Sequence, residues 1–294
     1  MAGSIKGPAG DPERAVAHPS SLRVEYPHLF SYRFQKHMIT VRARPAGASG
    51  AFSWHVVSKL VRMDDVPVNR PPVIRDQDRV DVRLTEEAEY RIPFTFIEAL
   101  NEGTLADRPA HAFLDAARER RLFHVLNRTT DNIIGTGVIQ MASGSAQEAE
   151  VGGLLFHPAA RGFGLAALLV KIMMVYAIKE SGRDSPDEKY LAHVVDGNGA
   201  LHALLDAGFR PIGPLDVHRG DIDAVIDHMI KDGDSAVRMQ GFLFDREVIG
   251  RLVLALWKFV NEDHGVITRS SPAGNSFQIT VDFSHVIPPI HLYM

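Results

Sequence analysis

The chain has 294 residues, a formal net charge of −4 and a pI of about 6.4. Hydrophobic residues make up 45% and charged residues 23%, the balance of a soluble globular protein of one or two domains. The slightly acidic charge argues against a nucleic-acid partner that is held by bulk electrostatics. The chain contains no cysteine, which excludes disulfides, thiolate metal sites and a cysteine nucleophile.

The N-terminal quarter predicts a leader followed by a β-rich extension. Residues 1–20 lack the apolar stretch of a signal peptide and are interpreted as a disordered leader. Residues 21–75 hold two segments of mixed apolar and polar residues around a Gly-Ala-Ser-Gly loop, a hairpin pattern, and end on a proline-rich linker. The most apolar run, Gly164 to Ile178, is shorter than the ~20 residues that span a bilayer. We therefore expect a soluble, cytoplasmic protein with no membrane partner.

Residues 76–214 predict a mixed α/β unit. The apolar patterns favour strands at residues 80–84, 122–127, 133–140, 148–156 and 190–195. Helical stretches are expected between Phe94 and Arg120, and the longest helix follows Gly164, where apolar residues recur at steps of three and four. A short helix over Ala200 to Ala207 is closed by Gly208.

Residues 215–294 predict a C-terminal α/β extension. A strand is expected over VRMQGFLFD, an amphipathic helix over Arg246 to Asn261, and a final strand over SFQITVDF. We expect the two extensions to cover a cleft of the central unit, to add strands to its sheet or to form the surface of a homodimer.

The segment LLFHPAARGFGLAALLVKIM gives the clearest indication of a ligand site. A strand ends at Pro158, a loop of small residues follows from Arg161 to Ala166, and a helix begins. Small residues let backbone N–H groups turn inward, and a helix N-terminus adds a partial positive charge. Arg161 can add a charge-assisted contact. The segment therefore predicts a site for a phosphate or pyrophosphate.

Such a loop is also typical of dinucleotide sites. Gly162 to Ala167 fits the string G-x-G-x-x-A, and Glu180 lies near the place of a ribose-binding acid. In that fold the glycines follow the strand closely and open the first βαβ unit. Here HPAAR separates strand from glycines, at mid-chain. A dinucleotide-dependent oxidoreductase is therefore the less favoured reading.

The segment more closely resembles the cofactor loop of the GNAT acetyltransferases. That loop reads Arg/Gln-x-x-Gly-x-Gly/Ala after a strand that ends in an apolar-x-Pro step, and here FHP precedes Arg161, Gly164 and Ala166. A second signature of the family is a strand, an asparagine, a short helix and a closing Gly-Phe. It corresponds to YLAHVV, Asn198, ALHALLDA and Gly208-Phe209, with the asparagine displaced by one residue. The resemblance covers about half of the chain.

The resemblance implies a GNAT-type α/β fold: a mixed, mostly antiparallel central sheet flanked by helices, with β-rich N- and C-terminal extensions. It also implies transfer of an acetyl or other acyl group from acetyl-CoA or another acyl-CoA to a primary amine by direct attack. The acceptor would be an amine-bearing small molecule, a peptide or a protein. The cofactor-binding residues would be Leu155, Phe156, His157, Arg161, Gly162, Phe163, Gly164, Leu165, Ala166 and Asn198.

The catalytic groups are less clearly marked. The family's proton-donating tyrosine lies four residues before the closing glycine, where this chain has Leu204, which cannot donate a proton. The candidate bases are Glu148 and Glu150, on one face of a strand, and His193 on the next strand, which could act near neutral pH. Tyr176 and Tyr190 could substitute as donors, with packing roles as the alternative for each. A module that binds acyl-CoA without turnover therefore stays open, and no metal site is predicted because histidines at ligand spacing are missing.

Overall fold

The computed structural model describes residues 30–34, 37–46, 51–56, 61–62, 74–101, 105, 108–141, 147–180, 188–195, 198–218, 236–270 and 276–288. The chain divides into two compact units, Met1–Val68 and Asn69–Met294. The leader expected at residues 1–20 and most of the proline-rich linker lie outside the described residues. The domain boundaries drawn from the sequence at residues 20, 75 and 214 stay predictions.

The first unit contains a small antiparallel sheet. Its strands are β1 (Phe30–Phe34), β2 (His37–Ala46), β3 (Ala51–Val56) and β4 (Val61–Arg62). Strand β2 pairs with each of the other three. Strands β2 and β3 pair antiparallel, as the hairpin pattern of the sequence predicts, and the Gly-Ala-Ser-Gly segment at residues 47–50 lies outside the described residues.

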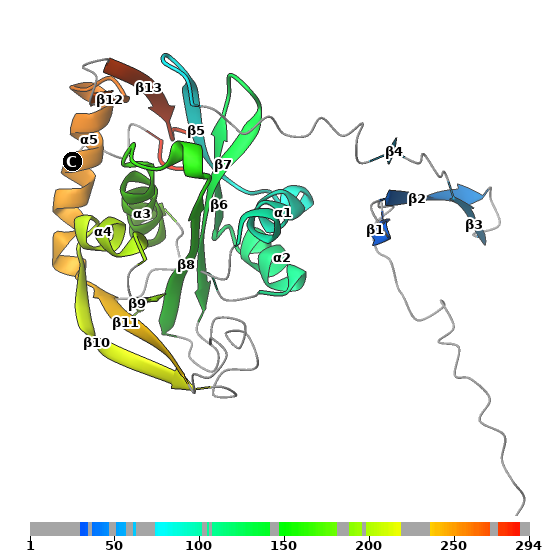
Figure 1. The fold of residues 1–294 in the computed structure, drawn as a ribbon, viewed down its shortest axis with the longest axis horizontal. Helices are drawn as coiled ribbons and strands as arrows, with labels where there is room; N and C mark the ends of the chain where they lie inside the picture. The colour runs from blue at the N-terminus through cyan, green and yellow to red at the C-terminus, as the bar shows by residue number, and fades with distance from the viewer. Residues whose placement is uncertain are drawn as a thin grey trace, which may run out of the picture. The chain divides into compact units, whose positions relative to one another are not determined.

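The second unit is built on a nine-stranded sheet (Figure 1). Its strands are β5 (Arg79–Leu84), β6 (Leu122–Asn127), β7 (Asn132–Met141), β8 (Glu148–Phe156), β9 (Lys189–Val195), β10 (Phe209–His218), β11 (Ala236–Phe244), β12 (Val266–Ser270) and β13 (Ser276–Asp282). They lie in the order β10-β11-β9-β8-β7-β6-β5-β13-β12. Only β8–β9 and β13–β5 are parallel, so the sheet is mixed and mostly antiparallel, as expected.

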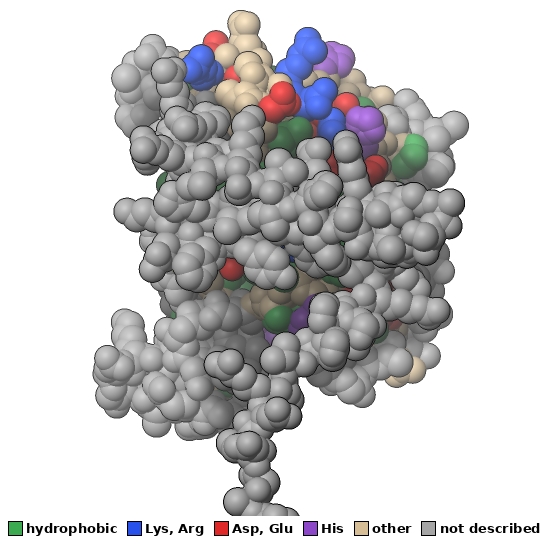
Figure 2. All heavy atoms as spheres, turned by 90° about the vertical axis from the view of Figure 1, so that its right-hand side faces the viewer, with side chains coloured by type: hydrophobic (Ala, Val, Ile, Leu, Met, Phe, Trp, Pro, Cys, Tyr) green, Lys and Arg blue, Asp and Glu red, His purple; other side chains and the backbone are tan. Residues whose placement is uncertain are grey.

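Helices cover both faces of this sheet. Figure 1 shows α1 (Arg91–Leu100) and α2 (Ala110–Arg118) on one side, and α3 (Leu165–Val175), α4 (Ala200–Asp206) and α5 (Ile249–Asn261) on the other. The 3-10 turns Glu87–Glu89 and Arg246–Val248 precede α1 and α5, a third at Pro158–Ala160 follows β8, and a wider π turn at Tyr176–Glu180 continues α3. On the face shown in Figure 2, the visible described side chains include Lys and Arg among Asp, Glu and His.

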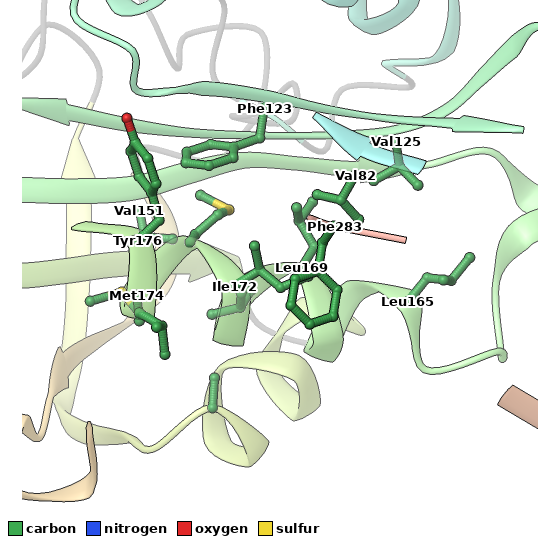
Figure 3. Close-up of a cluster of buried hydrophobic side chains, with 14 of the residues drawn as sticks. Val82, Phe123, Val125, Val151, Leu165, Leu169, Ile172, Met174, Tyr176 and Phe283 are labelled. Carbon is green, nitrogen blue, oxygen red and sulfur yellow. The ribbon is translucent and has the colours of Figure 1, made fainter. Parts of the chain in front are cut away.

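Helix α3 forms the centre of the larger hydrophobic core. Its side chains Leu165, Leu169 and Ile172 lie opposite the sheet residues Val82 and Phe123 (Figure 3). The helix is buried on almost all sides because α4 and α5 pack over its outer face, which explains why it is hydrophobic all round rather than amphipathic. Truncation of such a core leucine typically costs about 2–5 kcal/mol. The packing therefore fixes the start of α3 beside the end of β8.

The C-terminal segment belongs to the same sheet. Strand β11 lies between β9 and β10, and β13 extends the sheet beyond β5. Helix α5 contributes Leu252, Val253 and Leu256 to the core under α3. Residues after 214 thus help to hold the elements that surround the predicted site.

Candidate functional site

A cleft opens where β8 and β9 stop pairing. The two parallel strands pair only from Glu148↔Lys189 to Glu150↔Leu191, although β8 continues to Phe156 and β9 to Val195. Beyond that point lies a cavity of about 780 Å³. Its lining residues are Leu105, Leu154, Leu155, Phe156, Ala160, Arg161, Gly162, Gly164, Leu165, Ala166, Ala167, Val195, Asn198, Gly199, Ala200, His202, Ala203 and Asp206. Separated strands leave backbone N–H and C=O groups that a ligand can pair with.

A β-bulge in β8 directs residues into this cleft. Val138 pairs with Gly152 and Thr136 with Leu155, so two residues of β8 lie opposite one residue of β7. Gly153 has a φ of 59°, and a Cβ added there would lie 2.9 Å from Val138, which is why glycine suits this position. The Thr136 hydroxyl donates a hydrogen bond of 2.8 Å to the Gly153 carbonyl. The bulge shifts the in–out alternation of β8 just before Leu154 to Phe156.

The loop after β8 has the geometry of an anion site. Gly162 and Gly164 have φ values of 81° and 78°, and Gly164 caps the N-terminus of α3. Both glycines line the cavity, and a Cβ on Gly164 would meet no atom within 4 Å. The conformation, rather than crowding, therefore requires glycine at 164. The first N–H groups of α3 have no partner within the helix and carry its partial positive charge.

Two arginines stand at this loop. Arg161 Nε donates to the Phe156 carbonyl at 3.1 Å. Arg269, from β12, donates from Nη1 to the Arg161 carbonyl at 3.3 Å, and its Cζ lies 5.1 Å from the centroid of the Phe163 ring. Among the described residues, neither guanidinium forms an ion pair with a carboxylate. The loop thus carries positive charge that no carboxylate of the described residues pairs with.

Eight of the ten expected cofactor residues line the cavity: Leu155, Phe156, Arg161, Gly162, Gly164, Leu165, Ala166 and Asn198. His157 instead caps its own turn, because its Nδ1 accepts the Ala159 N–H at 3.2 Å. Partial burial lowers the pKa of His157, and the charge of Arg161 lowers it further. Phe163 is buried and belongs to the core cluster under the sheet.

The cavity wall opposite the loop is the start of α4. The Asn198 side chain accepts the Ala200 N–H at 2.9 Å and so begins the helix. Leu204, at the position where the resemblance would place a tyrosine, is only 2% exposed. His202 and Asp206 line the cavity as well, and sequence reasoning had singled out neither. His202 and Asp206 are four residues apart and so lie on the same face of α4, and this spacing is the sequence signal that could have pointed to them.

The substitute tyrosines have other partners. The Tyr176 hydroxyl accepts a hydrogen bond from Arg120 Nε at 3.3 Å. The Tyr190 hydroxyl donates to Glu188 Oε2 at 2.9 Å and is buried within the sheet. Neither residue lines the cavity.

The candidate bases are separated by the structure into a pair and a single residue. His193 Nδ1 lies 3.3 Å from Glu150 Oε1, and Arg108 Nη2 lies 3.8 Å from Glu150 Oε2. Glu148 lies at the beginning of β8, with its carboxylate 3.9 Å from Lys189 Nζ in a solvent-exposed ion pair. Arg108, which precedes α2, was missed because nothing in its sequence neighbourhood marks it.

Mutual interaction sets the charge states of this group. Burial would raise the pKa of Glu150, but the hydrogen bond from His193 and the charges of Arg108 and His193 hold it below its usual range. The hydrogen bond to Glu150 raises the pKa of His193 against the opposing effect of burial. Burial lowers the pKa of Arg108, whose Nη1 is buried without a hydrogen-bond partner. An imidazole bonded to an ionised carboxylate is suited to accept a proton.

The described part of the chain has neither a cluster of metal ligands nor a helix that could span a membrane. It holds no group of three or more His, Asp or Glu side chains that could bind a metal ion. None of its helices is both long and apolar enough to cross a membrane.

Comparison with known proteins gives a family match and several distant structural matches. Residues 86–209 match the model of the acetyltransferase (GNAT) family. A ribosomal-protein-S5-alanine acetyltransferase from Vibrio fischeri aligns at 14% identity over 56% of this chain and 93% of that chain, with a TM-score of 0.42.

A GNAT-family acetyltransferase from Bacillus anthracis aligns at 15% identity over 59% of this chain and 99% of its own, with a TM-score of 0.39. A variant of the spermidine N-acetyltransferase of Vibrio cholerae aligns at 17% identity over 62% and 98%, also with a TM-score of 0.39. No curated protein matches the sequence.

Proposed function

We propose that the GNAT acetyltransferase domain in residues 86–209 of this chain transfers an acyl group from acyl-CoA to a primary amine. The observation that carries the proposal is the cavity between the separated ends of β8 and β9, which closes on the loop from Arg161 to Ala166. One part of this cavity has strand backbone that lacks a neighbouring strand, which suits an amide-containing arm. Another part has a positively charged glycine loop, which suits phosphates. A cofactor with both features would match the cavity.

The residues present fit acetyl-CoA or a related acyl-CoA. Backbone groups of Leu154 to Phe156 would bond the pantetheine arm, because β9 has separated from β8 there. The N–H groups of Gly162 to Ala166 would hold the pyrophosphate at the N-terminus of α3. The open space over Gly164 and the two unneutralised arginines support this assignment.

The Glu150–His193 pair is the candidate general base that its mutual hydrogen bond supports; its two residues do not themselves line the cavity. The amine attacks the thioester carbonyl, its proton passes to His193 directly or through a water molecule, and the carboxylate of Glu150 stabilises the imidazolium. Bound acyl-CoA would supply the acyl group as a thioester, and CoA would leave as the thiolate when the amide bond forms. Glu148 remains the alternative carboxylate. Its carboxylate pairs with the exposed Lys189, whereas the hydrogen bond of His193 is to Glu150.

Protonation of the leaving thiolate does not need a side chain. Leu204 offers no proton, and Tyr176 and Tyr190 are engaged elsewhere. A thiol has a pKa of about 8.5, so solvent can protonate a CoA thiolate at neutral pH. The acceptor would be an amine-bearing small molecule, a peptide or a protein.

A second candidate function is an acyl-CoA-binding module without turnover. The buried Leu204 at the tyrosine position favours it. The two candidates differ in one observable, because an enzyme releases free CoA thiol when amines are added and a binding module does not.

The experiment that tests the proposal is calorimetric titration of the full chain with acetyl-CoA, with NADPH as the comparison ligand. Micromolar affinity, about −8 kcal/mol, for acetyl-CoA alone would support the cofactor assignment. Thiol release on addition of mixed polyamines, amino acids and peptides would then support the enzyme. Binding of NADPH in place of acetyl-CoA would favour the oxidoreductase reading, and binding of neither would refute the loop assignment.

A further inference from the structure

The C-terminal hairpin reaches the loop through one side chain. Arg269 is the fourth residue of β12, which pairs, among the described strands, with β13 alone at the end of the nine-stranded sheet. In sequence it lies 108 residues after Arg161. The chain therefore brings an arginine from outside the family-matched segment, residues 86–209, to the loop that the family uses for its cofactor.

Arg269 contacts three successive residues of the loop. Its Nη1 donates to the Arg161 carbonyl at 3.3 Å, and its guanidinium stacks on the buried Phe163 ring at 5.1 Å. A Cβ added to Gly162 would lie 3.1 Å from the same guanidinium. Since Gly162 lines the cavity, Arg269 packs against the part of the loop that borders the cavity. These contacts hold the loop in its left-handed turn at Gly162, where φ is 81°.

The charge of Arg269 is available to a ligand. Its side chain belongs to an exposed residue, and the described residues provide no carboxylate partner for it. Stacking on a ring uses the face of the guanidinium and one N–H is used on Arg161, so further N–H groups at its edge remain for an anion. A planar fork of N–H donors suits phosphate oxygens.

We propose that Arg269 is a second phosphate-binding residue, supplied by the C-terminal hairpin, which positions the loop and contacts the nucleotide phosphates of acyl-CoA. The inference rests on the proposed function, because it needs the cofactor to be a phosphorylated one. Its consequence is that the C-terminal segment forms part of the cofactor site. The contacted group is a phosphate ester or the diphosphate.

The test compares acetyl-CoA binding by the full-length wild type, Arg269→Gln, Arg269→Lys and a control. Arg251→Gln removes the same charge from an exposed position on α5. Loss of one charge-assisted contact at an exposed site should raise the Kd for Arg269→Gln about tenfold. Arg269→Lys should recover part of that loss, and Arg251→Gln should bind as the wild type does. Thermal unfolding of each variant shows whether the fold is intact.

Two further measurements separate a ligand contact from a purely structural role. Added salt should weaken wild-type binding more steeply than binding by Arg269→Gln, because the variant has lost one screened attraction. Dephospho-acetyl-CoA, which lacks the 3′-phosphate, identifies the group: a variant effect that vanishes with this ligand assigns the 3′-phosphate, and one that persists assigns the diphosphate.

The outcomes distinguish the inference from the function on which it rests. If the wild type binds acetyl-CoA and Arg269→Gln binds it equally well, the role of Arg269 is refuted and the proposed function stands. Equal losses for Gln and Lys, with unchanged salt dependence, would also refute the phosphate contact. A wild type that binds no acetyl-CoA would overturn both.

Discussion

At the scale of single residues, the Glu150–His193 pair gives the most direct prediction. His193 must be neutral to accept a proton, so activity should rise with pH through the pKa of His193. The hydrogen bond to Glu150 and the charge of its carboxylate raise that pKa above its ordinary 6.5. Glu150→Gln removes the charge, so the acidic limb of the rate profile should move to lower pH. Turnover at the plateau should fall about 100-fold, because the imidazolium loses its stabilising partner.

The measurement is kcat/KM against pH, followed by release of the CoA thiol. Glu262→Gln, an exposed carboxylate beyond α5, is the matched control and should leave both the limb and the plateau unchanged. Glu148→Gln compares the two candidate carboxylates of β8. A shifted limb in Glu148→Gln, with an unchanged profile in Glu150→Gln, would transfer the role to Glu148.

The sequence could nominate residues of this pair but not their partners. Strand alternation places Glu148 and Glu150 on one face, and nothing in that pattern separates them. The separation comes from β9: its parallel register pairs Glu148 with Lys189 and Glu150 with Leu191, and the side chain of His193, two residues beyond Leu191, contacts Glu150. Arg108 contacts Glu150 and Arg269 contacts the loop at Arg161, and both arginines come from segments that do not pair with β8. Their contacts depend on tertiary packing, and no local motif predicts them.

At the scale of the element, the junction of β8 and α3 gives the second prediction. Gly164→Glu places a carboxylate beside the proposed phosphates, where like charges separated by a few ångströms repel by a few kcal/mol. Acetyl-CoA affinity should therefore fall about 100-fold or more in a calorimetric titration. Undiminished binding would show that the phosphates lie elsewhere.

Gly164→Ala provides the control for backbone strain. The left-handed φ of 78° should cost about 1–2 kcal/mol of stability, but a Cβ there meets no atom within 4 Å. The alanine variant should therefore lose thermal stability while retaining much of its affinity. A large loss of affinity in both variants would assign the effect to the loop conformation rather than to charge.

Elements with strong periodicity could be predicted from the sequence, and irregular ones could not. The apolar steps after Gly164 indicated α3, and the strands around residues 129–132 indicated the β6–β7 hairpin. The bulge at Gly153 was not predicted, because glycines inside a strand, here Gly152 and Gly153, can mark a bulge, a bend or only a weak point, and the pattern does not separate these. Its register shift appears when Val138 and Thr136 are paired with β8. The cleft depends on that irregularity, so its shape lay beyond the sequence patterns.

At the scale of the whole molecule, the order of strands decides which part of the chain can fold. Sequence patterns predicted the C-terminal strand and helix, but their position in the sheet is a long-range property. Among the described strands, β10 joins the sheet only through β11. A core that ends at residue 214, as the sequence suggested, would therefore leave β10 without its partner and β9 as an exposed edge.

Truncation tests this dependence. A chain of residues 69–218 lacks β11 and α5, and so exposes the core that Val253 and Leu256 cover at 0% and 1% exposure. Each large apolar side chain contributes about 1.5–3 kcal/mol on burial, and a domain has only about 5–15 kcal/mol of stability. We expect this fragment to show no cooperative thermal transition. Residues 69–294, which keep the whole compact unit, should unfold cooperatively and bind acetyl-CoA as the full chain does. If the shorter fragment unfolds cooperatively, residues after 218 are not needed for folding. If the longer fragment does not bind acetyl-CoA, residues 1–68 are needed for binding of the cofactor.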